Sequence, residues 1–303
     1  MMFGTVAIIG LGLLGGSTGL AVQSFLPEVR TTGYDADPAT RARARERGLC
    51  HDISESAAEA VREADLVIFC VPVGAMGAAA AEVAGALKTG VVVSDVGSSK
   101  QAVAKALGEA LPGVAIIPAH PVAGTENSGP DAGFADLFRN RWCIVTPPED
   151  ANPHQLTALV QFWEALGANV ELMSAPHHDL VLAVTSHLPH LIAYTIVGTA
   201  SDLEEVTRSE VIKYSAGGFR DFTRIAASDP TMWRDVFLSN REAVLEMLQR
   251  FTEDLTELQK AIRLGNGEVL FDHFTRTRAI RRSIIEQGQD DARPDFGRSD
   301  HKD

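Results

Sequence analysis

The first 35 residues place a short strand, a glycine-rich turn, a helix and a second strand in direct succession. Residues 5–9 form a β-branched run, residues 10–15 read GLGLLG, and residues 17–25 are apolar enough for a buried helix. A second strand candidate, residues 30–34, ends at Asp35. Because a helix separates the two strands, we expect them to pair in parallel, at the start of a doubly wound α/β sheet.

The glycine turn predicts a dinucleotide cradle. In such units the first glycine permits a tight turn, the second lets backbone approach a pyrophosphate, and the third brings helix against strand. The cofactor contacts expected here are Gly10, Gly12, Leu13, Leu14 and Gly15. The carboxylate of Asp35 can accept hydrogen bonds from an adenosine ribose and would repel a 2′-phosphate, so the pattern favours NAD as the cofactor. A solvated turn residue is the alternative for Asp35.

Strands and helices continue to alternate through the first half of the chain. The further strands expected are residues 66–71, 91–95, 142–146 and 169–173. The helices expected between them are residues 76–87 and 153–166. Polar or proline-containing segments follow strands at 70–73, 95–100 and 119–121. Ligands of open parallel sheets bind at the carboxyl ends of strands, so Val71, Pro72 and Ser98 join the expected cofactor contacts.

From about residue 174 onward the strand pattern disappears. The helices expected there are residues 177–199, 204–215, 218–227, 230–265 and 268–286. The chain therefore reads as an α/β fold: a Rossmann-type doubly wound sheet (residues 1–174) followed by an all-α domain (residues 175–288). A polar tail, residues 289–303, is expected to be disordered. By analogy, such helical domains supply a substrate wall and a homodimer interface.

Composition narrows the classes of partner. The 303 residues are 45% hydrophobic, enough for a large core, and 40 acidic against 27 basic residues give a formal charge of −13 without a basic block. Nucleic acid is therefore not an expected partner. The uncharged N-terminal 27 residues are interrupted by glycines and lack a preceding basic region, so neither membrane anchoring nor export is expected. Three cysteines without a C-x-x-C pair fit the cytoplasm.

His120 is the candidate catalytic base. It stands at a strand end, and Pro121 restricts its backbone to an extended conformation. An imidazole of ordinary pKa is neutral in the cytoplasm and can take a hydroxyl proton while hydride leaves the same carbon. A structural histidine is the alternative. Ser98 or Ser99 could orient the imidazole or the nicotinamide amide, or cap the helix that follows.

The helical half carries the candidate substrate contacts. Ser186-His187-Leu-Pro-His190 places two histidines on one helix face, and Gly217-Gly-Phe-Arg-Asp-Phe-Thr-Arg224 starts with a double glycine that backbone or ligand can approach closely. A guanidinium fork, from Arg224 first, suits a carboxylate. A metal site that includes His177, His178 and Asp179 is disfavoured, because no H-E-x-x-H or cysteine set accompanies them and hydride chemistry on NAD needs none.

Taken together, the glycine turn, DVGSSK at 95–100, HPVAGTE at 120–126, SHLPH at 186–190 and GGFRDFTR at 217–224 resemble the prephenate/arogenate dehydrogenase family. The longer run HPVAGTENSGPD is most similar to its cyclohexadienyl dehydrogenases, which accept either ring substrate. The resemblance implies an NAD-dependent oxidoreductase of tyrosine biosynthesis that removes hydride from C4 of prephenate or arogenate, with loss of carbon dioxide.

By motif position, the resemblance implies roles for particular residues. His120 would accept the hydroxyl proton with support from Ser98, and Arg224 would anchor a carboxylate. The other substrate contacts implied are Ser186, His187, His190, Gly217 and Glu126. Glu126 could hold an arginine, gate the cleft or sense a substrate amino group. The alternatives are a 3-hydroxyacid dehydrogenase, which would need a lysine such as Lys213 in the helical domain, and a non-catalytic NAD-sensing protein.

Overall fold

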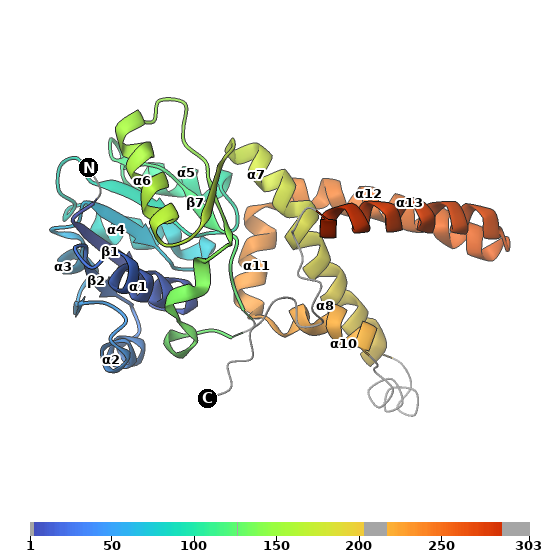
Figure 1. The fold of residues 1–303 in the computed structure, drawn as a ribbon, viewed down its shortest axis with the longest axis horizontal. Coiled ribbons are helices and arrows are strands. Elements are labelled where there is room, and N and C mark those ends of the chain that lie inside the picture. Colours follow the sequence, from blue (N-terminus) through green and yellow to red (C-terminus); the bar gives the residue numbers. More distant parts are fainter. Residues whose placement is uncertain (1–2, 126, 203–216, 287–303) are drawn as a thin grey trace. The chain divides into compact units, whose positions relative to one another are not determined.

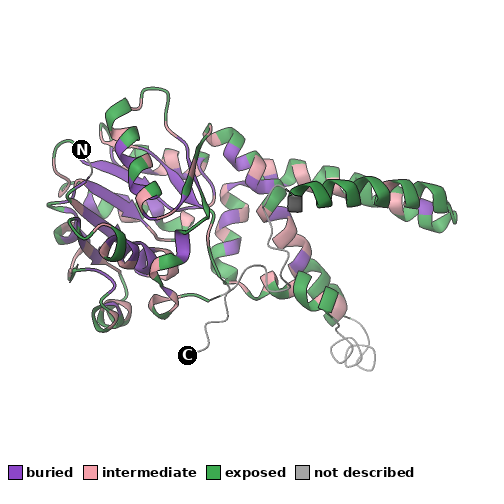
Figure 2. Ribbon diagram, in the orientation of Figure 1, coloured by how far each residue is buried: buried purple, intermediate pink, exposed green. Residues whose placement is uncertain are grey.

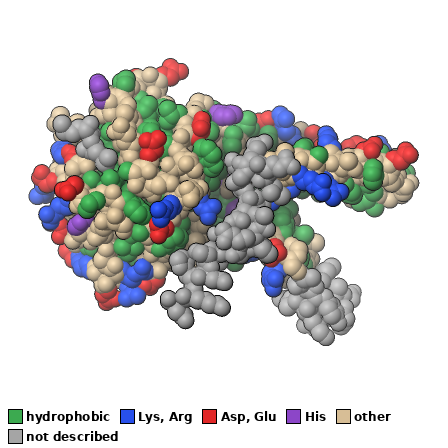
Figure 3. Space-filling view, in the orientation of Figure 1, with side chains coloured by type: hydrophobic (Ala, Val, Ile, Leu, Met, Phe, Trp, Pro, Cys, Tyr) green, Lys and Arg blue, Asp and Glu red, His purple; other side chains and the backbone are tan. Residues whose placement is uncertain are grey.

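The computed structural model describes residues 3–125, 127–202 and 217–286 (Figure 1). By packing, the chain divides into two compact units, Met1–Leu245 and Glu246–Asp303. On the face shown in Figure 3, basic and acidic side chains are interspersed over the first unit. The helix expected at 204–215 and the tail expected at 289–303 lie outside the described residues.

A six-stranded parallel sheet forms the centre of the first unit. Its strands are β1 (Thr5–Ile9), β2 (Arg30–Tyr34), β3 (Asp52–Ile53), β4 (Leu66–Phe69), β5 (Val92–Asp95) and β6 (Ala115–Ile116). They lie in the order β3-β2-β1-β4-β5-β6, and all neighbouring pairs are parallel. The strand order reverses between β1 and β4, and open α/β sheets bind ligands at such a point. The predicted Rossmann-type sheet is confirmed.

Two apolar clusters cover the two faces of this sheet. The helices that contribute are α1 (Leu13–Phe25), α3 (Ala57–Val61), α4 (Met76–Val83), α5 (Gln101–Ala110) and α6 (Pro153–Ala165). In β1, Val6 and Ile8 pack with α1 and α6, whereas the alternate residues Ala7 and Ile9 pack with α3, α4 and α5. Because both faces are covered, β4 is apolar throughout and β5 is buried at every residue, and Figure 2 colours the central strands as buried.

The strand that carries His120 belongs to a second, three-stranded sheet. Its strands are β7 (Ala119–Pro121), β8 (Trp142–Val145) and β9 (Asn169–Leu172). β7 runs antiparallel to β8, with His120 opposite Ile144, whereas β8 and β9 are parallel. The expected strand at His120 therefore exists, but it is not an end of the six-stranded parallel sheet. β6 ends the parallel sheet at Ile116, three residues before β7 begins.

The rest of the first unit is helical. Its elements are α7 (Ala175–Leu182), a π-helix (Ala183–His187), α8 (Leu188–Ser201), α10 (Gly217–Thr223), a 3₁₀ turn (Arg224–Ala227) and α11 (Pro230–Ser239). The single helix expected at 230–265 is wrong: it breaks at Asn240, and α12 (Arg241–Arg263) begins after it. The side chain of Asn240 is buried and bonded to α7, so tertiary contacts override the helical pattern at this residue.

Residues 175–201 form the one described helical stretch that is long and apolar enough to cross a membrane by length and composition. Its α7 and π-helical parts, however, bury the polar side chains His178, Asp179 and His187. Asp179 accepts hydrogen bonds from backbone N–H groups of the Rossmann part. Buried charges persist in proteins only when they are paired, so these contacts show that α7 packs against the Rossmann part.

The second unit contains the remainder of α12 and α13 (Gly267–Glu286). Most of its described residues are exposed, as the green helices in Figure 2 show. Several large apolar side chains are among them, namely Leu255, Ile262, Leu264, Phe271, Phe274 and Ile280. Apolar area on this scale is typical of a surface that another protein covers.

Candidate active site

The three glycines of the first turn differ in what surrounds them. Gly10 has a positive φ of 99°, and a Cβ there would lie 2.8 Å from the backbone of Cys70. A Cβ at Gly15 would lie 1.8 Å from the carbonyl oxygen of Gly10, so helix α1 reaches the strand only because both residues lack side chains. At Gly12 nothing lies within 4 Å of the Cβ position. The space that an approaching pyrophosphate needs is therefore at Gly12.

Helix α1 begins next to this space. Its N-cap is Gly12, which makes no side-chain hydrogen bond, and its first turn contains no acidic residue. The N–H groups at a helix start attract an anion, so Leu13 and Leu14 offer backbone donors to a phosphate. These features fit the pyrophosphate of a dinucleotide. Val71 and Pro72 follow β4 beside the turn, where Cγ1 of Val71 would lie 3.0 Å from a Cβ at Gly10.

Asp35 is held beside the glycine turn by hydrogen bonds to backbone. Its carboxylate accepts one from the N–H of Leu11 at 2.8 Å and one from the N–H of Asp37 at 3.0 Å. The side chain is only partly buried. The carboxylate is thus fixed at the end of β2 with access to solvent, as an acceptor for ribose hydroxyls requires.

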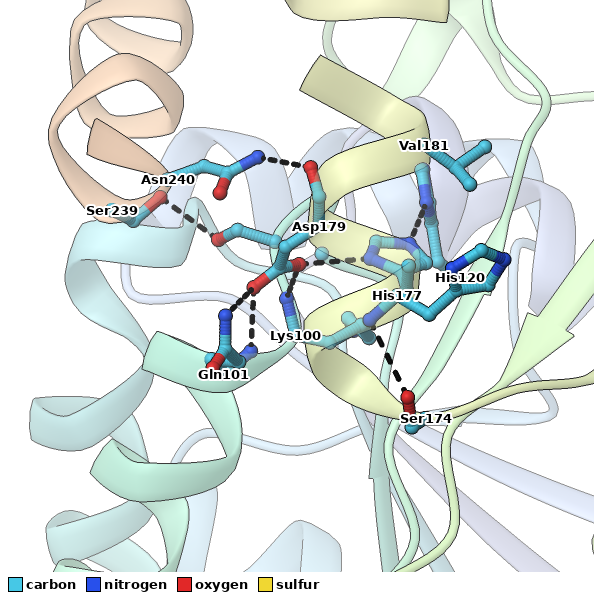
Figure 4. Close-up of polar contacts among 12 residues, drawn as sticks. Lys100, Gln101, His120, Ser174, His177, Asp179, Val181, Ser239 and Asn240 are labelled. Atoms are coloured by element: carbon cyan, nitrogen blue, oxygen red, sulfur yellow. Dashed lines mark hydrogen bonds and ion pairs between the residues drawn. The ribbon is translucent and has the colours of Figure 1, made fainter. Parts of the chain in front are cut away.

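His120 is buried and contacts a second histidine. Its Nδ1 lies 2.9 Å from Nε2 of His178, and Nδ1 of His178 lies 2.9 Å from the Asp179 carboxylate (Figure 4). The two rings meet edge to face, with centroids 5.1 Å apart. The chain of contacts is therefore His120 to His178 to Asp179. His178 thus holds Nδ1 of the candidate base, and the expected support by Ser98 stays a prediction.

Asp179 also caps helix α5. The N-cap residue of α5, Lys100, makes no side-chain capping bond. Asp179 replaces it from α7, accepting hydrogen bonds from the N–H of Lys100 at 2.7 Å and from the N–H of Gln101 at 3.0 Å. Burial acts to raise the pKa of Asp179, but the hydrogen bonds from His178 and these two amides outweigh it and lower the pKa. Asp179 is therefore a carboxylate at neutral pH.

The charge of Asp179 determines the tautomers of both histidines. Burial lowers the pKa of His178, and burial together with the neighbouring His178, Lys100 and His187 lowers the pKa of His120 well below its ordinary value. Both rings are thus neutral at pH 7. A carboxylate only accepts, so His178 donates from Nδ1 and accepts at Nε2, and His120 must donate from Nδ1. The lone pair of His120 is then on Nε2, where a base needs it.

A buried ion pair lies behind the His120 strand. Lys100 and Asp95 pair with both side chains fully buried, and Nζ of Lys100 also donates to the carbonyl oxygen of Ala119 at 2.6 Å. Asp95 accepts a further hydrogen bond from the N–H of Gly97 at 2.7 Å. Lys100 therefore fixes the residue that precedes His120. The sequence indicates Lys100 only as a helix start, because its partners lie on two other strands.

The π-helix positions His187. A π turn contains one more residue than an α turn and often occurs at functional sites. Here it directs His187 towards Asn240, with His187 Nδ1 and Asn240 Nδ2 3.1 Å apart. Burial lowers the pKa of His187 to about 4, although the Asp179 carboxylate and a hydrogen bond with the Ser98 backbone act in the opposite direction.

His190 and Arg224 are the two further candidates for substrate contact. His190 stacks on Trp233, with ring centroids 3.7 Å apart, and its Nδ1 lies 2.8 Å from the carbonyl oxygen of Ser186. Burial lowers the pKa of His190, and the Arg224 cation lowers it further. Arg224 is exposed, and its guanidinium can pair with a carboxylate. Ser186 takes part through its backbone.

Other expected residues lie outside this cluster. Gly217 is exposed, and the atom nearest its Cβ position belongs to Asp221, 3.8 Å away. Arg220 pairs with Asp221 at 3.8 Å on the surface. The hydroxyl of Ser99 lies 2.8 Å from that of Ser239, so of the two serines it is Ser99 that joins the Rossmann part to α11. Glu126 and Lys213 lie outside the described residues.

Three site residues were missed by sequence reasoning. His178 and Asp179 entered it only as weak metal ligands, and Asn240 was read as part of a continuous helix. The amide of Asn240 donates to the carbonyl oxygen of Asp179 at 2.8 Å and also contacts His187. Asn240 therefore joins the His120 and His187 groups. Within the described ranges, no three His, Cys, Asp or Glu side chains are placed to hold a metal ion.

Comparison with known proteins identifies the family. Residues 18–172 match the nucleotide-binding domain of prephenate dehydrogenase, and residues 174–276 match its dimerization domain. The chain belongs to the prephenate dehydrogenase family. Among its relatives, the cyclohexadienyl dehydrogenase of Zymomonas mobilis is 46% identical over 283 residues, covering 93% of this chain and 97% of that protein. The Bacillus subtilis prephenate dehydrogenase is 32% identical over 91% of this chain and 75% of its own length.

Solved structures of the prephenate dehydrogenase family share the fold. The prephenate dehydrogenase from Aquifex aeolicus, solved with hydroxyphenyl propionate and NAD+, superimposes with a TM-score of 0.86 at 32% identity, covering 94% of this chain and 98% of that one. Synechocystis arogenate dehydrogenase gives a TM-score of 0.78 at 25% identity, covering 92% and 99%. The family resemblance expected from the sequence motifs is confirmed.

Proposed function

We propose that this chain is an NAD-dependent dehydrogenase that oxidatively decarboxylates prephenate, arogenate or both, giving 4-hydroxyphenylpyruvate or tyrosine. The observation that carries the proposal is the His120–His178–Asp179 chain, which leaves a neutral base with a free Nε2 at the centre of the site. Named relatives support the substrate class: cyclohexadienyl dehydrogenase in Zymomonas and prephenate dehydrogenase in Bacillus.

The cofactor assigned is NAD. The open space at Gly12, the uncapped start of α1 and the Asp35 carboxylate fit a pyrophosphate and an unphosphorylated ribose. The Aquifex relative was solved with NAD+. When bound, NAD accepts the hydride that leaves C4 of the ring. The contacts assigned are Gly10, Gly12, Leu13, Leu14, Gly15, Asp35, Val71, Pro72 and Ser98.

The residues of this chain supply a base and an anchor. His120 Nε2 takes the proton of the C4 hydroxyl, which makes the ring an imidazolium. The Nδ1–H of His120 continues to donate its hydrogen bond to His178 during this step. The Asp179 carboxylate stabilises that cation through His178. As hydride leaves C4, its oxygen becomes a carbonyl. The bond to the ring carboxylate then breaks with release of carbon dioxide, its electron pair makes the ring aromatic, and the phenolate oxygen that results takes up a proton. Burial excludes water from His120, which is 8% exposed.

Arg224 is assigned the substrate carboxylate, with His187, His190 and Ser186 along the wall. His190 is fixed against Trp233 by ring stacking. An anchor that bound the departing carboxylate too tightly would oppose its loss as carbon dioxide. If Arg224 binds that carboxylate, it must not bind it more tightly in the ground state than in the transition state. Gly217 and Glu126 remain assigned to substrate by motif position.

We further propose a cytoplasmic homodimer. The match of residues 174–276 to a dimerization domain and the exposed apolar side chains of α12 and α13 support assembly through the helical domain. We set the domain boundary at residue 174, with the NAD-binding domain before it and the helical domain from 175 to 288. A dimer of this chain would cover the apolar residues.

The proposal is tested with purified protein, NAD, and prephenate or arogenate in separate assays. We expect NADH absorbance to rise with formation of 4-hydroxyphenylpyruvate or tyrosine, together with stoichiometric carbon dioxide. Side-by-side kcat/KM values assign the preferred ring substrate. No turnover with either substrate would contradict the function. A non-catalytic NAD sensor would then be favoured if NAD still bound.

A further inference from the structure

A glutamate outside the cofactor motif holds two arginines close to the Asp35 loop. Glu55 lies between β3 and α3, and its Oε2 accepts hydrogen bonds from Nε of Arg41 at 3.3 Å and from Nη2 at 3.2 Å. Its other oxygen pairs with Arg45. Both arginines lie on α2 (Pro38–Arg47), the helix that follows Asp35. One carboxylate thus engages two cations.

Arg41 is already part of the Asp35 loop. Its Nη1 donates to the carbonyl oxygen of Asp35 at 2.8 Å and to that of Ala36 at 3.2 Å, and its guanidinium lies over the Tyr34 ring, 5.5 Å from the centroid. The side chain of Arg41 is 12% exposed, whereas that of Glu55 is 68% exposed. Arg41 is therefore a positioned cation beneath the residues that would meet an adenosine ribose.

A 2′-phosphate on that ribose would need such a cation. NADP sites of this fold commonly place an arginine near the end of the second strand, whereas a carboxylate there repels the phosphate. In this chain Arg41 has the necessary location, but its fork is occupied by Glu55 and by two carbonyl oxygens. The Arg45 cation lowers the pKa of Glu55, so Glu55 remains a carboxylate at neutral pH. The charge that could attract a phosphate is thus neutralised locally.

We propose that Glu55 is a cofactor-specificity residue, which excludes 2′-phosphorylated dinucleotides by holding Arg41 and Arg45 and adding a second negative charge behind Asp35. The inference rests on the proposed use of NAD. Two residues would act against a 2′-phosphate in different ways. Asp35 repels the phosphate directly, and Glu55 prevents Arg41 from attracting it when that repulsion is removed. Loss of Asp35 alone then leaves phosphate binding weak.

Binding of adenosine probes tests this without turnover. Isothermal titration with adenosine 5′-monophosphate and adenosine 2′,5′-bisphosphate gives a ratio of dissociation constants for wild type, Asp35→Asn, Glu55→Gln and the double variant. We expect Asp35→Asn to shift the ratio towards the bisphosphate by about ten-fold. Adding Glu55→Gln should shift it by about a further five-fold, as expected for a solvent-exposed pair. Adding Arg41→Gln should remove that further gain.

Glu46 provides the matched control. It lies on α2, the helix of Arg41 and Arg45, and pairs with Arg43 at 2.7 Å. Glu46→Gln on the Asp35→Asn background removes the same charge and should leave the ratio within about two-fold. Equal gains from Glu46→Gln and Glu55→Gln, or a gain below about two-fold from Glu55→Gln, would overturn the proposal.

Failure of the enzyme assignment gives a different result. If wild type bound adenosine 5′-monophosphate but turned over neither ring substrate, the proposed reaction would be wrong and the binding ratios would still support or refute the role of Glu55. If wild type bound the bisphosphate as tightly as the monophosphate, the role of Glu55 would be wrong whether or not the reaction occurred.

Discussion

His120 and His178 face each other through ring nitrogens 2.9 Å apart, and both rings are buried. Only one of the two nitrogens can donate when both rings are neutral. Asp179 decides which one, because its carboxylate accepts the hydrogen bond donated by His178 Nδ1–H. The orientation of the base is thus fixed from behind, by residues that need not touch the substrate.

Replacing His120 with Asn should remove the proton acceptor and leave the cofactor cradle intact. We expect kcat to fall by about two to four orders of magnitude, with an unchanged dissociation constant for NAD. In wild type, the lowered pKa of His120 should keep the acid limb of kcat/KM below its ordinary value near pH 6.5. Retained activity in His120→Asn would make this histidine structural.

Asp179→Asn should disturb the tautomers of His120 and His178 while largely preserving the capping of α5. Its amide oxygen can still cap α5, but the neutral group no longer stabilises an imidazolium through His178. We expect kcat to fall by about ten- to a thousand-fold, with a smaller change in KM. Gln101→Ala is the control, because it removes only the 3.3 Å contact of its side chain with Asp179. Equal loss of kcat in both variants would refute a specific role for the Asp179 charge.

The buried neutral His187 should make the fold sensitive to acid. Its pKa is about 4 in the folded chain against 6.5 for an ordinary histidine, so the unfolded chain binds more protons between these values. Stability is therefore greatest above pH 6.5 and falls as pH decreases, by about 2 kcal/mol at pH 5 from this residue. Urea unfolding of wild type and His187→Gln at pH 7 and pH 5 measures it; identical pH dependence in both would contradict the contribution.

Arg224→Ala should weaken substrate binding. Loss of a guanidinium–carboxylate contact is expected to raise KM for prephenate or arogenate by about ten- to a hundred-fold, with a smaller effect on kcat. Arg220→Ala is the matched control, since Arg220 pairs with Asp221 on the surface. A raised KM in Arg220→Ala and an unchanged one in Arg224→Ala would move the anchor to Arg220.

Gly12 and Gly15 should respond differently to the same substitution. Gly12→Ala meets no atom of the chain within 4 Å, so the melting temperature should be retained while NAD affinity falls by about ten-fold or more. Gly15→Ala places Cβ 1.8 Å from the Gly10 oxygen and should lower the melting temperature itself. Calorimetry with NAD titration separates the two. Full NAD affinity in Gly12→Ala would remove the pyrophosphate from this position.

Local pattern sufficed for much of this fold. The β-branched runs and the glycine turn predicted the parallel sheet, because buried parallel strands are continuously apolar and their crossover turns need glycine. His120 was identifiable because a His-Pro pair at the end of an apolar strand is a distinctive local pattern. The longer described helices of the second half were also identified by periodicity, apart from their breaks, whereas the short helix α3 was not.

What the sequence did not predict depends on contacts between distant segments. β7 joins β8 rather than the parallel sheet, and no local pattern near His120 specifies its pairing partner. Asn240 ends a helix because α7 offers it a carbonyl oxygen from 61 residues away. His178 and Asp179 read as an ordinary polar pair until α5 is placed against them.

The capping of α5 by Asp179 also links folding to catalysis. The same carboxylate that docks the helical segment onto the Rossmann part gives the base its correct proton arrangement. In a chain whose α7 has not docked against α5, Asp179 and His178 cannot fix the tautomer of His120. Such a chain would lack a prepared base, so docking of α7 and readiness of His120 for proton transfer are coupled through Asp179.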